Sequence, residues 1–349
     1  MNKKYLKNKK ILITGCTGFT GSWLILYLKF YGAKIYGYSK KPPFSNSIFD
    51  QLSLKNRIIF KEGNINDLKK FRKFFNKADP DIVFHLAANP IVKDCHDSPI
   101  DAFLSNSIGT LNILETVRNL KKDKKISLNI ITTDKVYKNN GKRKKFIESD
   151  ILDGDDPYSA SKVCAEIISK VYYKSYFQNK KISLNVFRSG NIIGGGDWSN
   201  SRLIPDIIKS CYKNKTLLVR NPKHIRPWQH IFDVINSYFL IAKKNFENNK
   251  FEFHAWNIGP SREKDFNVNE IIYLVLKRLQ KKKRIKSKRN NIIEKKNLSL
   301  NSNKVWKKFK IKNKIKTLEA INLTVDWYVN YFEKKDKYFS EKQLKEYLC

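Results

Sequence analysis

The sequence has few cysteines for its length, and their arrangement excludes two kinds of site. Its 349 residues include five cysteines, and no two of them form a Cys-x-x-Cys pair. An odd number without such a pair predicts neither a disulfide framework nor a zinc site. We therefore expect no metal and a reducing, cytoplasmic setting.

Long apolar runs are also missing. No stretch approaches the ~20 consecutive apolar residues of a membrane-spanning helix, and the run that begins at Trp23 ends at Lys29. The basic first ten residues precede only a very short apolar run that enters a glycine-rich turn, which is not the pattern of a secretion signal. We expect neither a membrane partner nor secretion.

Acidic residues are scarce, at 32 against 70 basic residues, which gives a net charge of +38. A nucleic-acid-binding protein would concentrate this charge on one surface, whereas compositional drift towards lysine would scatter it. Here the lysines are spread in pairs along the chain, which favours drift, so we expect no nucleic-acid partner. The dense basic run 280–289 is interpreted as a solvated loop or helix end, with an electrostatic contact as the alternative.

Short apolar strands alternate with helices over the first 190 residues. We expect strands at 10–14, 34–38, 57–62, 81–86, 127–133 and 183–188, and helices at 19–31, 67–75, 98–120 and 158–177. This alternation is typical of βαβ units and a parallel sheet. The predicted fold class is α/β, a Rossmann doubly wound parallel sheet with a smaller, mixed C-terminal substrate-binding domain.

The chain length fits about two domains. We expect a dinucleotide-binding domain over residues 1–190 and a substrate-binding region over 191–349. A helix at 234–243 and a strand at 255–259 indicate that segments near 227–259 return to the first domain. An amphipathic helix is expected at 317–333.

Three glycines, Gly15, Gly18 and Gly21, follow the first expected strand and open the first expected helix. This arrangement presents backbone N–H groups and the positive end of the helix dipole to a pyrophosphate, and side chains here would block the approach. It predicts a dinucleotide site, with a plain turn as the alternative.

The spacing of these glycines resembles that of the extended short-chain dehydrogenases/reductases. Ser39 ends the second strand and is followed by two lysines, where an acidic residue would hold the ribose 2′-hydroxyl. The charge at this position fits either NAD or NADP, and the resemblance favours a tightly bound NAD. The other cofactor residues that it implies are Thr17, Phe19, Asn64, Ile65, Leu86, Ala87, Ala88 and Asn106, with Tyr158 and Lys162.

Tyr158 and Lys162 form a Tyr-x-x-x-Lys motif on one face of an expected helix. A free tyrosine has a pKa near ~10, and a neighbouring ammonium together with the positive nicotinamide ring would favour its phenolate. Tyr158 is therefore a candidate base that removes a hydroxyl proton while hydride leaves the same carbon. Lys162 would also hold the nicotinamide ribose.

Thr133 ends the fifth expected strand, and Asp134 and Lys135 follow it. An Asp-Lys pair is often a surface turn, but ligands bind at the carboxyl ends of parallel strands. Residues 132–137, Thr-Thr-Asp-Lys-Val-Tyr, resemble the active-site segment of the CDP-glucose 4,6-dehydratases. The related dTDP-glucose enzymes typically carry Asp-Glu where this chain has Asp134 and Lys135.

The resemblance implies an NAD-dependent lyase that oxidises the sugar at C4, eliminates water across C5 and C6, and returns hydride to C6. It implies Lys135 as the base, Asp134 as the acid, and Thr133 as a hydroxyl near the substrate oxygen. Burial would favour neutral forms of both charged groups. A direct ion pair would oppose this, so we expect the two side chains to diverge. Such enzymes supply deoxysugars, as in the lipopolysaccharide O-antigen.

Residues 189–198, Ser-Gly-Asn-Ile-Ile-Gly-Gly-Gly-Asp-Trp, resemble the same family. The resemblance places Asn191 at the diphosphate of a nucleotide sugar, and nearby arginines suit that group through forked, charge-assisted bonds. The candidate substrate residues are Asn191, Arg202, Leu203, Arg220 and Arg226. His230 is expected to be structural, and Trp228 is either packing or a wall of the nucleotide pocket.

Two other interpretations stay open. One is an epimerase or another nucleotide-sugar dehydratase that acts on a dTDP-, GDP- or UDP-sugar, although an epimerase leaves Asp134 and Lys135 without a role. The other is a catalytically silent RNA-binding protein, which predicts salt-sensitive RNA binding. In the family, helices such as 98–120 and 158–177 build a dimer, so we expect a homodimer or higher homo-oligomer.

Overall fold

A computed structural model of the chain describes residues 6–120, 123–141, 144–260, 265–287 and 295–349. Its centre is a seven-stranded sheet with the order β11-β7-β5-β4-β1-β2-β3, in which neighbouring strands pair in parallel. This confirms the predicted Rossmann fold. The strands are β1 (Lys10–Thr14), β2 (Lys34–Ser39), β3 (Ile59–Glu62), β4 (Ile82–His85), β5 (Ile126–Ile131), β7 (Ile182–Ser189) and β11 (Phe253–Ile258).

The strand order reverses between β1 and β4. The chain runs from β1 outwards to β2 and β3, and then crosses back to β4 on the other side of β1. The residues that follow the two central strands are held together, because Leu86 N donates to Thr14 O at 3.1 Å. A crevice at the carboxyl ends of such strands is the usual ligand site of an open parallel sheet.

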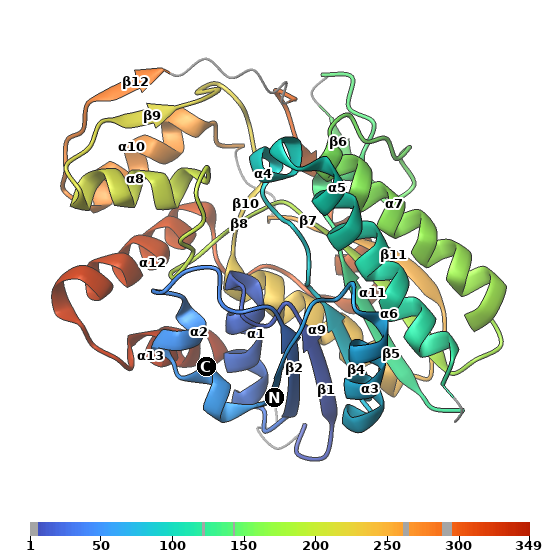
Figure 1. Ribbon diagram of the computed structural model, residues 1–349. Helices are drawn as coiled ribbons and strands as arrows, with labels where there is room; N and C mark the ends of the chain where they lie inside the picture. The colour runs from blue at the N-terminus through green and yellow to red at the C-terminus, as the bar shows by residue number, and fades with distance from the viewer. Residues whose placement is uncertain (1–5, 121–122, 142–143, 261–264, 288–294) are drawn as a thin grey trace.

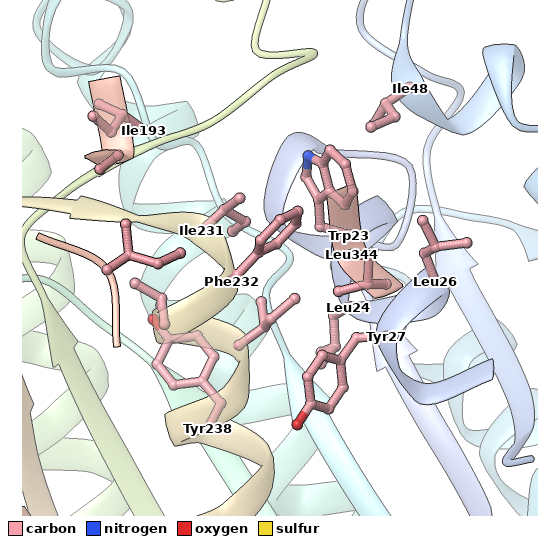
Figure 2. Packing of buried hydrophobic residues seen from close by; sticks show 14 of the residues in the cluster. Trp23, Leu24, Leu26, Tyr27, Ile48, Ile193, Ile231, Phe232, Tyr238 and Leu344 are labelled. Carbon is pink, nitrogen blue, oxygen red and sulfur yellow. The ribbon is translucent and has the colours of Figure 1, made fainter. Parts of the chain in front are cut away.

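One face of the sheet is covered by α1 (Phe19–Phe30) and α9 (Ile231–Glu247), which lie side by side (Figure 1). Figure 2 shows the core between them, where Trp23 meets Phe232 edge-on with 5.0 Å between ring centroids. Leu344, from α13 (Phe339–Leu348), belongs to the same core. Helix α9 thus packs on the sheet and strand β11 extends it, although both elements follow residue 190, where the first domain was expected to end.

The other face is covered by α3 (Leu68–Ala78), α6 (Gly109–Arg118) and α7 (Pro157–Tyr172). The start of α7 is strongly specified, because Asp156 caps the helix in a capping box with Ser159 and Pro157 stands in the first turn. This fixes the place of Tyr158. The predicted helix 98–120 is instead α5 (Pro99–Phe103), a π-helical stretch (Leu104–Ile108) and α6 in succession.

The remaining elements gather beside the sheet, and α8, α10, β9 and β12 form one group in Figure 1. Strand β8 (Asn191–Ile193) pairs with β10 (Trp228–His230), and β9 (Leu217–Val219) pairs with β12 (Ile285–Ser287). The other elements are α2 (Ile48–Gln51), α4 (Val92–Asp97), β6 (Lys145–Phe146), α8 (Leu203–Tyr212), α10 (Val268–Arg278), β13 (Ser299–Leu300), α11 (Asn303–Phe309) and α12 (Thr317–Val329).

The predicted end of the fifth strand was wrong, and the prediction for the basic run 280–289 was wrong in part. The fifth strand ends at Ile131. Thr133 is the N-cap of a short 3₁₀ turn over residues 134–136, and its side chain accepts a hydrogen bond from Lys135 N. In the basic run 280–289, residues 285–287 form β12 rather than a loop or helix end, and residues 288–289 lie outside the described residues.

Gly195 offers a test of the packing between α12 and the loop that follows β8. Its carbonyl accepts from Trp23 Nε1 at 2.9 Å, and a Cβ added to it would lie 1.9 Å from Trp327 Cγ. We expect Gly195→Ala to lower the free energy of unfolding by about 3 kcal/mol or more, because neither the backbone nor the buried ring can yield. Urea denaturation measures this.

Gly18→Ala is the matched control, because its added Cβ would meet only Gly15 O, at 3.4 Å. Its free energy of unfolding should stay within about 1 kcal/mol of the wild type. A Gly195→Ala protein as stable as this control would contradict the packing described here.

Candidate active site

A cavity of about 1070 Å³ opens at the carboxyl ends of the central strands. It brings together nearly every residue that the sequence proposed for a site. The predicted residues that line it are Gly15, Thr17, Gly18, Phe19, Gly21, Ser39, Asn64, Ile65, Leu86, Ala87, Ala88, Thr133, Asp134, Lys135, Tyr158, Lys162, Asn191, Arg202, Leu203, Arg220 and Arg226.

Asn106 is the exception, since it lies behind the cavity wall. Its Oδ1 accepts from Asn89 N at 2.7 Å, and its Nδ2 donates to Ser161 Oγ at 2.9 Å. Asn106 is 1% exposed, so it can act on a ligand only through the Asn89 backbone that it holds. Asn106 therefore holds the backbone of Asn89, which lines the cavity, and does not itself reach a cofactor there.

The glycine turn leaves no room for a side chain at Gly15 or at Gly21. Gly15 has φ +68°, and a Cβ there would lie 2.6 Å from Ala87 N. A Cβ on Gly21 would lie 2.4 Å from Gly15 O. The backbone N–H groups at the start of α1 are therefore open to a ligand at close range, as a pyrophosphate requires.

The end of β2 forms the next part of the cavity. Thr17 Oγ1 contacts Ser39 Oγ at 2.7 Å and donates to Lys40 O at 3.0 Å. Lys40 and Lys41 both line the cavity. The hydroxyl of Ser39 is thus held by Thr17 of the glycine turn, at the end of the strand where dinucleotide-binding proteins often carry a carboxylate for the ribose.

Tyr158 and Lys162 lie against the end of β5. Tyr158 is hydrogen-bonded to Thr133, and burial raises the pKa of Tyr158 to about 12. Lys162 Nζ donates to Ile131 O at 3.0 Å, and burial lowers the pKa of Lys162 to about 8. Within the protein alone, burial therefore outweighs the expected stabilisation of the phenolate.

Asp134 is fully enclosed at 3% exposure. Its Oδ1 accepts from Thr133 Oγ1 at 3.1 Å, while its buried Oδ2 has no hydrogen-bond partner among the described residues. Burial raises the pKa of Asp134 to about 6, although the charges of Lys135 and Arg226 work in the opposite direction. The carboxyl can therefore carry a proton at a higher pH than a free aspartate can.

The arginines proposed for the substrate are each held by protein groups. Arg202 Nη1 pairs with Asp197 Oδ2 at 3.2 Å, and Arg220 Nη2 donates to Ser201 O at 2.9 Å. Arg226 Nη2 contacts His224 Nδ1 at 3.1 Å. These partners orient the guanidinium groups at the cavity.

Asp197 and His224 also line the cavity, and sequence reasoning missed both as site residues. A signal existed for Asp197, because it follows three glycines and precedes Arg202 by five residues. His230 caps α9 by accepting from Phe232 N at 3.3 Å, and burial lowers its pKa to about 3, so its role is structural. Trp228 is 5% exposed yet lines the cavity.

The described residues contain neither a group suited to a metal ion nor a helix suited to a bilayer. Among them, no group of three or more His, Cys, Asp or Glu side chains could hold a metal ion. No helix within the described ranges has the length and apolar character that crossing a bilayer requires.

The fold and the cavity define a dinucleotide-binding protein of the short-chain dehydrogenase/reductase type. The chain belongs to the family of the GDP-mannose 4,6 dehydratases, which matches residues 12–324 and comprises nucleotide-sugar 4,6-dehydratases. It is 38% identical over 278 residues to the CDP-glucose 4,6-dehydratase of Salmonella typhimurium, covering 78% of this chain and 76% of that protein.

Solved structures show the same fold. The dTDP-glucose 4,6-dehydratase of Bacillus anthracis, in complex with NAD, matches with a TM-score of 0.78 and 24% identity over 93% of this chain and 98% of that one. The UDP-glucose 4-epimerase of Thermotoga maritima, with UDP-glucose, matches with a TM-score of 0.79 and 21% identity over 93% and 99%.

The raised pKa of Asp134 predicts a stability change with pH. The folded state holds this proton more tightly than the unfolded state, so the carboxyl lowers stability as pH rises from about 4 to about 6, by on the order of 3 kcal/mol in total.

The side chain that Asp134→Asn introduces cannot ionise. We expect the variant to be more stable than the wild type at pH 7.5, by on the order of 2–3 kcal/mol, and equally stable at pH 4. Urea denaturation at both values checks this, and a wild type at least as stable at pH 7.5 would contradict the assigned burial.

Proposed function

We propose that the chain is an NAD-dependent CDP-glucose 4,6-dehydratase, which converts CDP-glucose to CDP-4-dehydro-6-deoxyglucose and water. The observation that carries this proposal is the cluster of Asp134, Lys135 and Tyr158 in one cavity beside the glycine turn. The identity to the Salmonella enzyme supports the choice of nucleotide. The product class belongs to deoxysugar biosynthesis, and a cytoplasmic location is part of the proposal.

The cavity fits NAD at three places. The side-chain-free turn of Gly15, Gly18 and Gly21 accepts the pyrophosphate. Ser39 lies where the adenosine ribose would be bound, and Asn64 and Ile65 line the adenine end. Lys162, on α7, would hold the nicotinamide ribose. When bound, NAD supplies an acceptor for the hydride of C4 that later returns the same hydride to C6.

Tyr158 begins the reaction in this proposal. It takes the proton of the C4 hydroxyl as the hydride leaves C4, which makes a ketone. Thr133, hydrogen-bonded to Tyr158, holds the oxygen in line. Since burial keeps the pKa of Tyr158 at about 12, the phenolate requires positive charge beside it. Lys162 and the bound nicotinamide are the proposed sources.

Asp134 and Lys135 carry out the elimination. The ketone acidifies the C5 hydrogen, which Lys135 removes as a proton. The C6 hydroxyl leaves with the proton of Asp134 as water, and a carbon–carbon double bond joins C5 and C6. Hydride then returns to C6 while Lys135 gives its proton back to C5. The proton that Tyr158 gained from the C4 hydroxyl replaces, through solvent, the one that Asp134 gave up. Asp134 needs to be protonated for this, and burial, by raising its pKa to about 6, increases the fraction that carries a proton near neutral pH.

In this proposal the substrate diphosphate is bound by Asn191, Arg202 and Arg220, which line the same cavity as Tyr158. Leu203, the first residue of α8, and Arg226 complete the proposed substrate site. Asp197 would set the direction of Arg202 by its ion pair. An anionic substrate is also favoured by the net charge of +38.

The decisive experiment is mass spectrometry of the product that the purified protein makes from CDP-glucose with no NAD added. Loss of one water, with the cofactor carried through purification, is the expected result. Parallel reactions with dTDP-glucose, UDP-glucose and GDP-mannose identify the nucleotide. Conversion of another nucleotide sugar alone would overturn the CDP-glucose assignment, and isomerisation without loss of water would indicate an epimerase.

Lys135→Ala separates the two halves of the reaction. We expect dehydration to fall by about 100-fold or more, because no base remains at C5, while C4 oxidation continues and reduced nicotinamide accumulates. Absorbance of the bound nicotinamide and mass spectrometry of the sugar measure the two steps.

Tyr158→Phe is the contrasting variant for this test. It lacks the base that takes the C4 hydroxyl proton, so neither reduced nicotinamide nor product should form. A Lys135→Ala protein with full dehydratase activity would remove Lys135 from the mechanism.

We also propose a homodimer formed through α5 and α7. These helices pack side by side and expose large apolar side chains, including Ile100 at 73%, Ile167 at 53% and Val171 at 51%. An exposed apolar surface of this kind usually marks an interface. The same surface on a second copy would cover it in a two-fold dimer.

Replacing Ile167 and Val171 by Glu should convert the dimer to a folded monomer, because the charges cannot be buried without partners. Light scattering on a size-exclusion column measures this. Leu318→Glu, at a 51% exposed position on α12, is the control and should leave the mass unchanged. A double variant that stays dimeric would place the interface elsewhere.

A further inference from the structure

A buried ion pair lies behind the turn that carries Asp134 and Lys135. The side chains of Arg188, in β7, and Glu166, in α7, are 5% and 3% exposed. Arg188 Nε contacts both carboxylate oxygens of Glu166 at 3.0 Å, and Arg188 Nη2 donates to Oε2 at 2.6 Å. Neither residue lines the cavity, and the proposed reaction gives neither a chemical task.

Stability alone does not account for this pair. Burying two charges removes both from water, and apolar residues of similar volume often leave a protein equally or more stable. A planar guanidinium and a carboxylate do fix the direction of every group that they contact. The ion pair can therefore fix the positions of the groups to which it is hydrogen-bonded.

The pair reaches both ends of the catalytic turn. At one end, Thr132 Oγ1 donates to Glu166 Oε1 at 2.7 Å. At the other end, Arg188 Nη1 donates to Tyr137 Oη at 2.8 Å, and Tyr137 Oη donates in turn to Asn257 Oδ1 at 2.5 Å. Thr132 and Tyr137 bracket residues 133–136, so this one pair holds both ends of the turn.

The groups used for C4 oxidation are held differently. Tyr158 and Lys162 stand on α7, two turns and one turn before Glu166. They contact Thr133 and the carbonyl of Ile131 directly. Neither contact passes through Arg188 or Tyr137. The charge of Glu166 does raise the pKa of Lys162, against the larger effect of burial, so a change at Tyr137 is the one that leaves Lys162 unaffected. The orientation of the turn after Thr133 is what depends on the pair.

We propose that Glu166 and Arg188 are positioning residues for the elimination step. Through Thr132 and Tyr137 they hold the turn so that Asp134 and Lys135 face C6 and C5 of the sugar. This inference rests on the proposed dehydratase function. It requires that loss of the pair slows elimination more than it slows C4 oxidation.

The main test variant combines Glu166→Gln with Arg188→Met. It removes both charges together, since Arg188→Met alone would leave an unpaired carboxylate in the interior. Tyr137→Phe is a second variant, which keeps the ring stacked on Phe146 at 4.9 Å and removes only the hydroxyl. Circular dichroism and thermal melting establish that each variant is folded, and Tyr137→Phe decides the test if the double variant is not.

The readout separates the two steps. In a single turnover we expect nicotinamide reduction within about threefold of the wild type, kcat lower by about tenfold or more, and KM within about threefold. Reduced nicotinamide should then form a larger fraction of the bound cofactor at steady state. Arg278→Met breaks a forked pair with Asp326 that lies outside this network, and it should change none of these values.

A folded variant with wild-type kcat, or one that loses oxidation and elimination equally, would overturn the inference, since a merely structural pair affects both steps. The wild type is assayed first on the CDP-, dTDP-, UDP- and GDP-sugars. If it dehydrates none of them, the proposed function fails and takes the inference with it. If it dehydrates a sugar other than CDP-glucose, the variants are compared on that sugar.

Discussion

Three contacts between α7 and the end of β5 determine how the site is assembled. Tyr158 bonds to Thr133, Lys162 to the carbonyl of Ile131, and Glu166 to Thr132. The three helix residues are spaced by four and so share one face, and they meet consecutive residues of one strand end. Because β5 is also a central strand of the sheet, this interface sets these side chains in register with the crevice between β1 and β4.

Desolvation decides which protonation states the cavity favours. It raises the pKa of Asp134 to about 6 and lowers that of Lys162 to about 8, so the neutral form gains at both residues. A carboxyl whose pKa lies closer to neutrality suits the proton donation proposed for Asp134. The same effect opposes the phenolate of Tyr158, and Arg202 and Thr133 counter it only in part. The basic composition of the chain therefore matters less at this site than the exclusion of water.

The sequence predicts the local features of this protein well. The glycine turn and the Tyr-x-x-x-Lys motif are short-range patterns whose geometry follows from one strand end and one helix. The arrangement of Arg202 with Asp197, and of Arg188 with Glu166, depends on tertiary packing, which no local spacing specifies. The sequence does indicate that Glu166 shares a helix face with Tyr158 and Lys162, since the three residues are spaced by four. The π-helical stretches left no recognisable pattern, and the residue roles and the domain division at 190 stay predictions.

The helix α13 shows that the first βα unit is not a self-sufficient piece of the chain. Leu344 packs into the core beneath α1, and Tyr347 Oη donates to Asp233, whose carboxylate also accepts from the backbone N–H groups of Lys314 and Ile315. During synthesis on a ribosome, residues 10–30 emerge long before residues 339–348. The nascent chain must keep one side of its nucleotide-binding unit uncovered until residues 339–348 have been synthesised, which leaves that surface to chaperones in the interval.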